Sequence, residues 1–438
     1  MFHRFRSMPA TAMAAVLGCA LMTTAAVPAA AREKQKKEEA TQGPKLSPSK
    51  GFLPIAQKMD ETLKKKDAAG LQAAITEGQS AATSNDDKYF LGFYTLQLGI
   101  MNKDMALQEQ GLDTALESGL VPATDAAVYN FFSGQFAYQK KDFAKAAQRL
   151  EAAHTAGSTE TSLPDVLLDS YVKSGQVDKG VAFAKETITK AIAAGQRPSE
   201  QMFVIPARAL QEANRNDEMF DMLALRVQAY PNPQTWNQTL RLVLGTTSGN
   251  KAMSLDVFRL MRATDSLLNR NEVAEYAALA TEGALPGEAV AVIRAGKQSG
   301  IVKASDSQLN DMLKAQTERA GDEESTLDAY AKKPSTLSNP KVAGATGDAL
   351  IGYGHYAQAI PLYQAAASAG GADKETWAYR LAVAQALSGD AAAAKAGFGQ
   401  ITGPYKLLSR FWVAKLDAVP AAPTAAAPAA PAQPATGG

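Results

Sequence analysis

Side chains that could carry out acid–base or metal chemistry are few in this sequence and lie far apart. Beyond the first 31 residues the chain has two histidines, His154 and His355. They lack the close spacing that places two imidazoles on one metal ion. His154 falls near the end of an expected helix and His355 in an expected turn, where a histidine usually serves as a surface or capping residue. These two residues therefore predict neither a metal site nor a catalytic base.

Three short motifs resemble parts of cofactor or catalytic sites, but each lacks a required element. The glycine-rich stretch 245–251 ends in lysine but lacks the adjacent Gly-Lys-Ser/Thr of a phosphate loop. Residues 352–357 fit a dinucleotide fingerprint without the strand that must precede it. Ser170 and Lys173 have the spacing seen in penicillin-recognising enzymes, but the companion motifs are missing. We therefore expect no cofactor, and a protein that is not an enzyme.

Composition and charge exclude further classes of partner. The chain has 438 residues, of which 46% are hydrophobic and 20% charged, which is typical of a folded domain. Lysine and arginine number 45 against 44 acidic residues. Loss of Arg4 and Arg6 with a signal peptide would leave 43 against 44, a net charge of −1. This balance predicts no nucleic-acid partner.

Residues 1–31 have the pattern of a secretory signal peptide. Arg4 and Arg6 precede an apolar run over residues 10–26, and small residues end at Ala31. We expect cleavage after Ala31 and a periplasmic or otherwise exported protein. Two alternatives stay open: the run could remain as an uncleaved anchor, or Cys19 could be the acylated residue of a lipoprotein. Cleavage after Ala31 would remove the single cysteine of the chain.

Two polar or low-complexity segments flank the predicted folded body. Residues 32–50 are charged and contain two prolines, which predicts a flexible linker. Residues 419–438 form a Pro/Ala tract that cannot bury a core, which predicts a disordered tail. Beyond residue 31, no apolar run in the sequence approaches the length of a membrane span.

Between these segments the sequence predicts helices joined by turns. Apolar residues recur at helical spacing, as at Phe93, Leu96 and Ile100. No stretch alternates with period two for long enough to indicate a sheet. The sequence therefore predicts an all-α fold.

Residue types at the expected helix ends support this pattern. Asn232 precedes Pro233, which predicts an N-cap followed by a proline in the first turn. Ser305 and Gln308 have the spacing of a capping box. Three glycines fall where the first helix of a pair should end and the chain reverse: Gly175, Gly354 and Gly389.

Seven stretches look like degraded copies of one unit, a pair of short antiparallel helices that recurs every thirty-odd residues. In the clearest copy, Gly134 and Ala146 occupy positions where the two helices approach closely. Ala146 and Gly180, at matching positions of successive copies, are 34 residues apart. The same order of residue types recurs near the C-terminus. This pattern resembles the tetratricopeptide repeat, and the resemblance implies an α-solenoid of antiparallel helix pairs.

The match to the repeat divides the folded body into three segments. Residues 51–262 contain the N-terminal tetratricopeptide-like repeats, and residues 343–418 contain the C-terminal ones. Residues 263–342 form an irregular helical segment in which we find helices but no repeat register.

The resemblance also implies where a partner would bind. In the tetratricopeptide family, residues on the first helix of each pair line a concave groove. The positions that match are Phe131, Gln135, Asp165, Asp169, Tyr379 and Ala382. Family members that clamp a terminal carboxylate use lysine and asparagine at such positions. This chain has other residue types there, which favours a mixed apolar and acidic groove.

We therefore expect an exported, non-enzymatic scaffold or adaptor that mediates protein–protein interaction in the cell envelope. The alternative is an accessory factor associated with envelope polysaccharide or peptidoglycan. Trp236, Trp377 or Tyr379, if exposed side by side, would favour the stacking of a sugar ring and hence this alternative.

Overall fold

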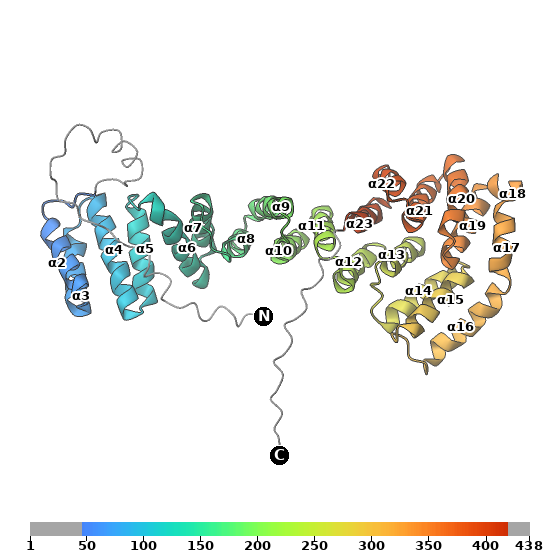
Figure 1. The fold of residues 1–438 in the computed structure, drawn as a ribbon, viewed down its shortest axis with the longest axis horizontal. Helices are drawn as coiled ribbons and strands as arrows, with labels where there is room; N and C mark the ends of the chain where they lie inside the picture. The colour runs from blue at the N-terminus through green and yellow to red at the C-terminus, as the bar shows by residue number, and fades with distance from the viewer. Residues whose placement is uncertain (1–45, 419–438) are drawn as a thin grey trace, which may run out of the picture. The chain divides into compact units, whose positions relative to one another are not determined.

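The computed structural model describes residues 46–418, and this part of the chain consists of helices and turns without a strand. The predicted signal peptide, 1–31, and the predicted tail, 419–438, lie outside the described residues. The prediction of an all-α fold is confirmed for residues 46–418. Consecutive helices pack as antiparallel pairs in a solenoid-like arrangement, which can be followed by colour in Figure 1.

Contacts between helices divide the chain into two compact units, the first ending at Lys190 and the second beginning at Ala191. The pairs of unit 1 are α2 (Leu53–Lys64) with α3 (Ala68–Ala81), α4 (Asn85–Asn102) with α5 (Met105–Glu117), α6 (Ala123–Gln139) with α7 (Phe143–Thr155), and α8 (Leu163–Lys173) with α9 (Val177–Ala193). The sequence-based boundaries at 262 and 342, which mark changes in repeat quality, do not coincide with this division.

Unit 2 contains five packed pairs and four further helices. The pairs are α10 (Gln201–Glu212) with α11 (Asn216–Ala229), α12 (Pro233–Thr246) with α13 (Lys251–Ala263), α14 (Arg270–Glu282) with α15 (Pro286–Gln298), α19 (Pro340–Tyr353) with α20 (Tyr356–Ser368), and α21 (Lys374–Leu387) with α22 (Ala391–Gly399). Between them, α16 (Ser307–Ala320) packs on α15 and α17 (Glu323–Ala331) packs on α19. The short α18 (Pro334–Leu337) lies between α17 and α19 along the chain, and α23 (Lys406–Asp417) follows the last pair as a single helix.

Each pair reverses direction at a residue with positive φ, and these residues give the repeat register. The φ angle lies between 45° and 97° at Lys66, Lys103, Lys141, Gly175, Asn214, Gly249, Ala284, Gly321, Gly354 and Gly389. Subtracting successive numbers gives separations of 37, 38, 34, 39, 35, 35, 37, 33 and 35 residues. Residues 46–418 therefore hold ten helix–turn–helix units, more than the seven stretches evident from sequence. Ala284 and Gly321 supply the register that was missing over residues 263–342.

Three of the turns in unit 1 share a Lys-Asp sequence, at residues 66–67, 103–104 and 141–142. The lysine takes positive φ, which costs an ordinary side chain about 1–2 kcal/mol. The aspartate donates its N–H to the carbonyl five residues earlier, at 2.8–2.9 Å. Its carboxylate accepts an N–H from the first turn of the next helix. Because one aspartate closes the first helix and caps the second, the turn forms without glycine.

Of the two N-caps predicted from the sequence, one is confirmed and the other is wrong. Asn232 caps α12 as expected, since its side chain accepts a hydrogen bond from the Thr235 N–H at 2.9 Å. The predicted capping box at Ser305 is wrong, because Asp306 is the N-cap of α16 and accepts from the Leu309 N–H at 3.1 Å. A carboxylate is the stronger acceptor at this position, and it places the start of the helix one residue later.

Glycines set the closest approach of two helices in unit 1. A Cβ atom added to Gly111 of α5 would lie 2.3 Å from the backbone nitrogen of Leu96 in α4. One added to Gly92 would lie 2.4 Å from the backbone nitrogen of Ala115. Gly134, predicted as a close-contact position, faces Leu150 with only 2.6 Å for an added Cβ. The backbones of α4 and α5 can therefore approach this closely only if Gly92 and Gly111 lack a side chain, and Leu150 can pack on α6 only if Gly134 lacks one.

The last part of the predicted linker belongs to the folded body. Leu46 packs against the core around α4 and α5. The Ser47 N–H donates to Asp86 and the Ser49 N–H donates to Asp87, each at 2.8 Å. These bonds fix residues 46–50 to the start of α4, so the predicted linker 32–50 extends five residues too far.

Asp87 is a buried carboxylate with several N–H donors. Burial alone would raise its pKa, but hydrogen bonds from Ser49, Thr83 and Ser84 lower it, and the pKa lies well below the ordinary value. A lowered pKa in the folded state means that the ionised carboxylate stabilises the fold above the unfolded pKa of ~3.9. This stabilisation is lost as pH falls below that value.

We predict that Gly111→Ala lowers the free energy of unfolding of unit 1 by about 1–3 kcal/mol, because the methyl group pushes α5 away from α4. Gly245→Ala, on α12 with no atom near an added Cβ, should be neutral or stabilising by up to ~1 kcal/mol. Urea unfolding followed by far-ultraviolet circular dichroism measures both. Trp236, Trp377 and Trp412 all lie in unit 2, so tryptophan fluorescence should show an unchanged transition for Gly111→Ala.

We predict that Asp87→Asn destabilises unit 1 by about 1–3 kcal/mol at pH 7, because a neutral amide is a weaker acceptor for these N–H groups. The difference from the unsubstituted protein should shrink as pH falls from ~5 toward ~2, because Asp87 takes up a proton in the unfolded chain over this range while it stays ionised in the folded one. Urea unfolding at a series of pH values measures this. Asp86→Asn, which loses one exposed hydrogen bond, is the control. A difference that stays constant with pH would contradict the assignment.

Candidate functional site

Two general features of residues 46–418 bear on the kind of site they could form. Over this range, no three His, Cys, Asp or Glu side chains are grouped so that they could hold a metal ion. None of the helices in the described part is both long and apolar enough to cross a membrane. The two features of unit 2 that stand out are a buried cluster of charges and an open apolar pocket.

The buried charge cluster joins four helices of unit 2. Arg259 of α13 donates to both oxygens of Glu288 of α15, with Nε–Oε1 at 2.9 Å and Nη2–Oε2 at 2.8 Å. Its Nη1 lies 2.9 Å from Asp256 and 3.4 Å from Asp348 of α19. Arg380 of α21 pairs with Asp256 at 3.0 Å and with Asp348 at 2.5 Å. The two guanidinium groups therefore connect α13, α15, α19 and α21.

Two tyrosines complete the hydrogen bonding of the charge cluster. The Tyr276 hydroxyl donates to Glu288 and the Tyr363 hydroxyl donates to Asp348, each at 2.7 Å. Burial, together with these carboxylates, raises the pKa of both tyrosines well above 10. Burial alone would raise the pKa of Glu288, but Arg259 lowers it below the ordinary value. Glu288 therefore stays ionised, and both tyrosines stay protonated, around neutral pH. Because these ion pairs and hydrogen bonds persist, the charge cluster acts as a brace that holds the helices together.

A second contact brings the end of unit 2 back to its beginning. Phe411 of α23 packs edge-on against Phe220 of α11 and Trp236 of α12, with ring centroids 6.1 and 6.4 Å apart. Arg410 pairs with Asp221 at 3.2 Å. Together with the charge cluster, this contact makes unit 2 a closed arrangement in which α19–α23 pack on α11–α15 (Figure 1). The space that an open solenoid leaves to a partner is here partly filled by the chain itself.

Three of the six residues predicted to line a groove are buried in the core. Phe131 is 1% exposed and belongs to a cluster of side chains from α6, α7 and α8. Tyr379 and Ala382 are fully buried. Tyr379 stacks on Tyr405 at 4.5 Å and accepts a hydrogen bond from the Trp412 indole at 3.0 Å. These three residues have no surface to offer a partner, and their assignment to a groove is wrong.

The other three predicted groove residues are half-buried in unit 1. Asp169 of α8 accepts a hydrogen bond from the Tyr138 hydroxyl of α6 and pairs with Lys173 at 2.6 Å. Its carboxylate therefore serves the contact between neighbouring pairs. Gln135 and Asp165 lie on α6 and α8, and their role in a groove stays a prediction.

The aromatic residues considered for sugar binding do not form an exposed platform. Trp236 is 3% exposed and packs on Phe411, and Tyr379 is fully buried. Trp377 is half-buried and stacks on Tyr363 with ring centroids 6.3 Å apart. These rings pack against the helices of unit 2, so the polysaccharide alternative loses the feature that favoured it.

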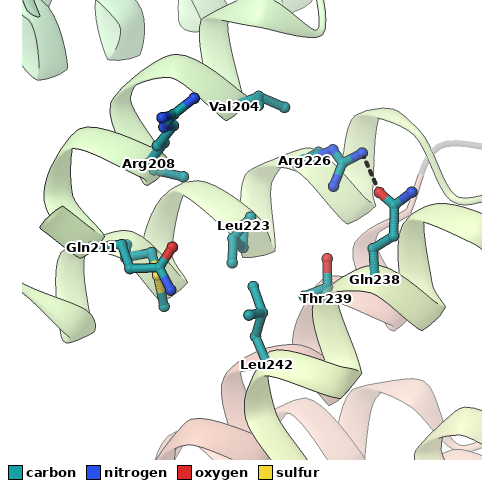
Figure 2. Close-up of a pocket in the computed structure, with 10 residues that line it drawn as sticks. Val204, Arg208, Gln211, Leu223, Arg226, Gln238, Thr239 and Leu242 are labelled. Carbon is teal, nitrogen blue, oxygen red and sulfur yellow. Dashed lines mark hydrogen bonds between the residues drawn. The ribbon is translucent and has the colours of Figure 1, made fainter. Parts of the chain in front are cut away.

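An open apolar pocket of about 220 Å³ lies between α10, α11 and α12. Its lining comprises Val204, Ala207, Arg208, Gln211, Met219, Leu223, Arg226, Gln238, Thr239 and Leu242, which are drawn as sticks in Figure 2. Sequence reasoning missed this pocket. A signal was present in Leu242, which falls outside the apolar face that Trp236, Leu240 and Val243 form on α12, and which is 40% exposed.

Arginine and glutamine form the polar edge of the pocket. The Arg226 side chain donates to Glu200 at 2.6 Å and to Gln238 at 2.9 Å, and the second of these bonds is visible in Figure 2. Arg208 pairs with Glu212 at 2.9 Å, where both side chains are largely exposed. Thr239 is fully buried, and its hydroxyl has no hydrogen-bond partner among the described residues.

Comparisons with known proteins give similarities to solved structures alone. No protein-family model matches this chain, and no curated protein matches it. Among solved structures, the chain is similar to one titled "Structure of Naa15/Naa10 bound to HypK-THB", with 12% identity and a TM-score of 0.37. The alignment covers 86% of this chain and 60% of that chain, so this chain spans less than two thirds of its length.

We predict that Arg259→Met destabilises unit 2 by about 3–5 kcal/mol, because it leaves the buried Glu288 without a counter-charge. The matched control is Lys251→Met on the same helix, which breaks an exposed pair with Glu282 and should cost under ~1 kcal/mol. Urea unfolding followed by tryptophan fluorescence reports unit 2 selectively. Equal effects of the two substitutions would show that the charge cluster is not a brace.

Proposed function

We propose that this chain is a helical-repeat scaffold or adaptor that binds protein partners and has no catalytic activity of its own. The observation that carries the proposal is the pocket between α10, α11 and α12, which is lined by apolar side chains from three helices and leaves Leu242 40% exposed. A preformed apolar pocket with a polar edge is a usual feature of a binding site. The packed pairs around it supply a rigid support of the kind on which repeat proteins hold partners.

We further propose that the protein acts in the cell envelope after export. The support is the sequence of residues 1–31, with its basic start, apolar run and small residues before Arg32. The near balance of 45 basic and 44 acidic residues supports a protein partner over a nucleic acid.

The proposed function predicts a covalent adduct with one partner protein in living cells. The photoreactive residue benzoylphenylalanine, placed at exposed Gln211 on the edge of the pocket, should yield a discrete protein adduct on irradiation. The same residue at exposed Lys251 of α13, outside the pocket lining, is the control. Mass spectrometry identifies the partner, and N-terminal sequencing of the adduct should begin at Arg32.

Each outcome bears on a separate part of the proposal. Loss of protein adducts at both positions would contradict a protein-binding scaffold. Equal adducts at both positions would count against the pocket as the place of contact. A chain that begins at Met1 would contradict cleavage of the signal peptide, and a lipid-modified N-terminus at Cys19 would replace it with a lipoprotein.

A further inference from the structure

We propose that the pocket between α10, α11 and α12 receives one bulky apolar side chain from an acidic peptide segment of a protein partner. This inference rests on the proposed function and adds the site and the chemistry of the partner. The site differs from the groove implied by the repeat resemblance, because that groove is lined by first helices alone. Here the second helix of a pair, α11, supplies Met219, Leu223 and Arg226.

The size of the pocket selects a single large side chain. Its volume is about 220 Å³, and a cavity of ~150 Å³ already holds a benzene ring. Its apolar walls come from all three helices: Val204 and Ala207 of α10, Met219 and Leu223 of α11, and Leu242 of α12. Leu242 keeps 40% of its surface exposed at the edge. An aromatic or branched aliphatic side chain would fill the space and cover Leu242, which removes apolar surface from water.

An unsatisfied hydroxyl in the lining favours a peptide over a pure hydrocarbon. Thr239 is fully buried, and its Oγ1 has no partner among the residues that the structure describes. In the view of Figure 2 this oxygen is directed toward the space between Leu223 and Arg226. A buried hydroxyl without a hydrogen bond is unfavourable, and a ligand that supplies one gains affinity. A peptide backbone beside the inserted side chain offers both a carbonyl acceptor and an N–H donor, whereas an acyl chain offers neither.

The charges at the edge favour an acidic partner. Among the ten lining residues, two are arginines and none is acidic. Arg226 is held in place by Glu200 and Gln238, and its side chain is 12% exposed. The Arg208 side chain is 79% exposed, and its Nε–H donates to Glu212. The other four N–H donors of its guanidinium group are therefore available to a partner. Carboxylates on either side of the inserted side chain can therefore form charge-assisted hydrogen bonds at this edge.

Binding of a defined peptide to the full chain tests this inference. The probe is a fluorescein-labelled heptapeptide with a central phenylalanine, two glutamates on each side of it, and a glycine at each end. We expect saturable binding by fluorescence polarisation, weakened at least tenfold when the central residue is alanine or when lysines replace the glutamates. Affinity should also fall as salt concentration rises.

Three substitutions localise the binding. Leu242→Asp should weaken binding at least tenfold, whereas Leu337→Asp, a leucine of matched 39% exposure outside the pocket, should leave it unchanged. Thr239→Val should weaken binding several-fold without lowering the unfolding midpoint, because it removes an unsatisfied hydroxyl. Arg208→Gln should weaken the glutamate peptide and leave a peptide with glutamines in place of the glutamates unaffected.

The outcomes separate this inference from the proposed function. No saturable binding up to a peptide concentration on the order of 1 mM, or binding that survives Leu242→Asp, overturns the pocket assignment. Binding to phosphatidylglycerol vesicles that is abolished by Leu242→Asp, without peptide binding, replaces the peptide by an anionic lipid. If the cellular adduct partner binds Leu242→Asp and the unsubstituted chain equally, the scaffold function stands and this site fails. If the peptide binds as expected but no cellular protein adduct forms, the site stands and the scaffold function fails.

Discussion

The fold of unit 2 depends on two arginines that are buried with three carboxylates. Arg259 and Arg380 together contact Glu288, Asp256 and Asp348, which lie on helices far apart in the sequence. Each ion loses its hydration on burial, and only good geometry on all sides compensates for that loss. The charges therefore permit few alternative arrangements of α13, α15, α19 and α21. Apolar residues of similar volume would hold these helices together with less directional preference.

The same closure limits where the proposed partner could bind. Since α19–α23 pack on α11–α15, much of the inner surface of unit 2 is occupied by its own side chains. Binding is then expected at the edges of the closed arrangement, and the pocket on α10–α12 lies in the first three helices of the unit. There the apolar lining is still open and the hydroxyl of Thr239 is still unpaired.

The sequence predicted the helix pairs well, but it did not show which faces of the helices are exposed. Local signals, such as Asn232 before Pro233, or Gly354 at a turn, act within a few residues and could be read directly. The full register was hidden because lysine, asparagine and alanine also occupy the positive-φ turns, as at Lys103 and Ala284. Periodicity places a residue on a face of its helix but does not say which neighbour covers that face. Tyr379 was assigned to a groove for this reason, although α23, more than twenty residues later, buries it.

The buried charge cluster also constrains the order in which unit 2 can form. Asp256 and Arg380 are 124 residues apart, and Arg410 reaches Asp217 across 193 residues, whereas the described side-chain bonds of unit 1 span far shorter stretches of chain. At a synthesis rate of ~5–20 residues per second, Asp256 and Arg259 wait roughly 6–25 seconds before Arg380 has been made. During that interval α12 and α14 can already pack on α13 and Glu288 can already pair with Arg259, but Asp256 still lacks Arg380. Unit 1 can complete its helix pairs as they emerge, whereas unit 2 can close only when nearly the whole chain has been synthesised.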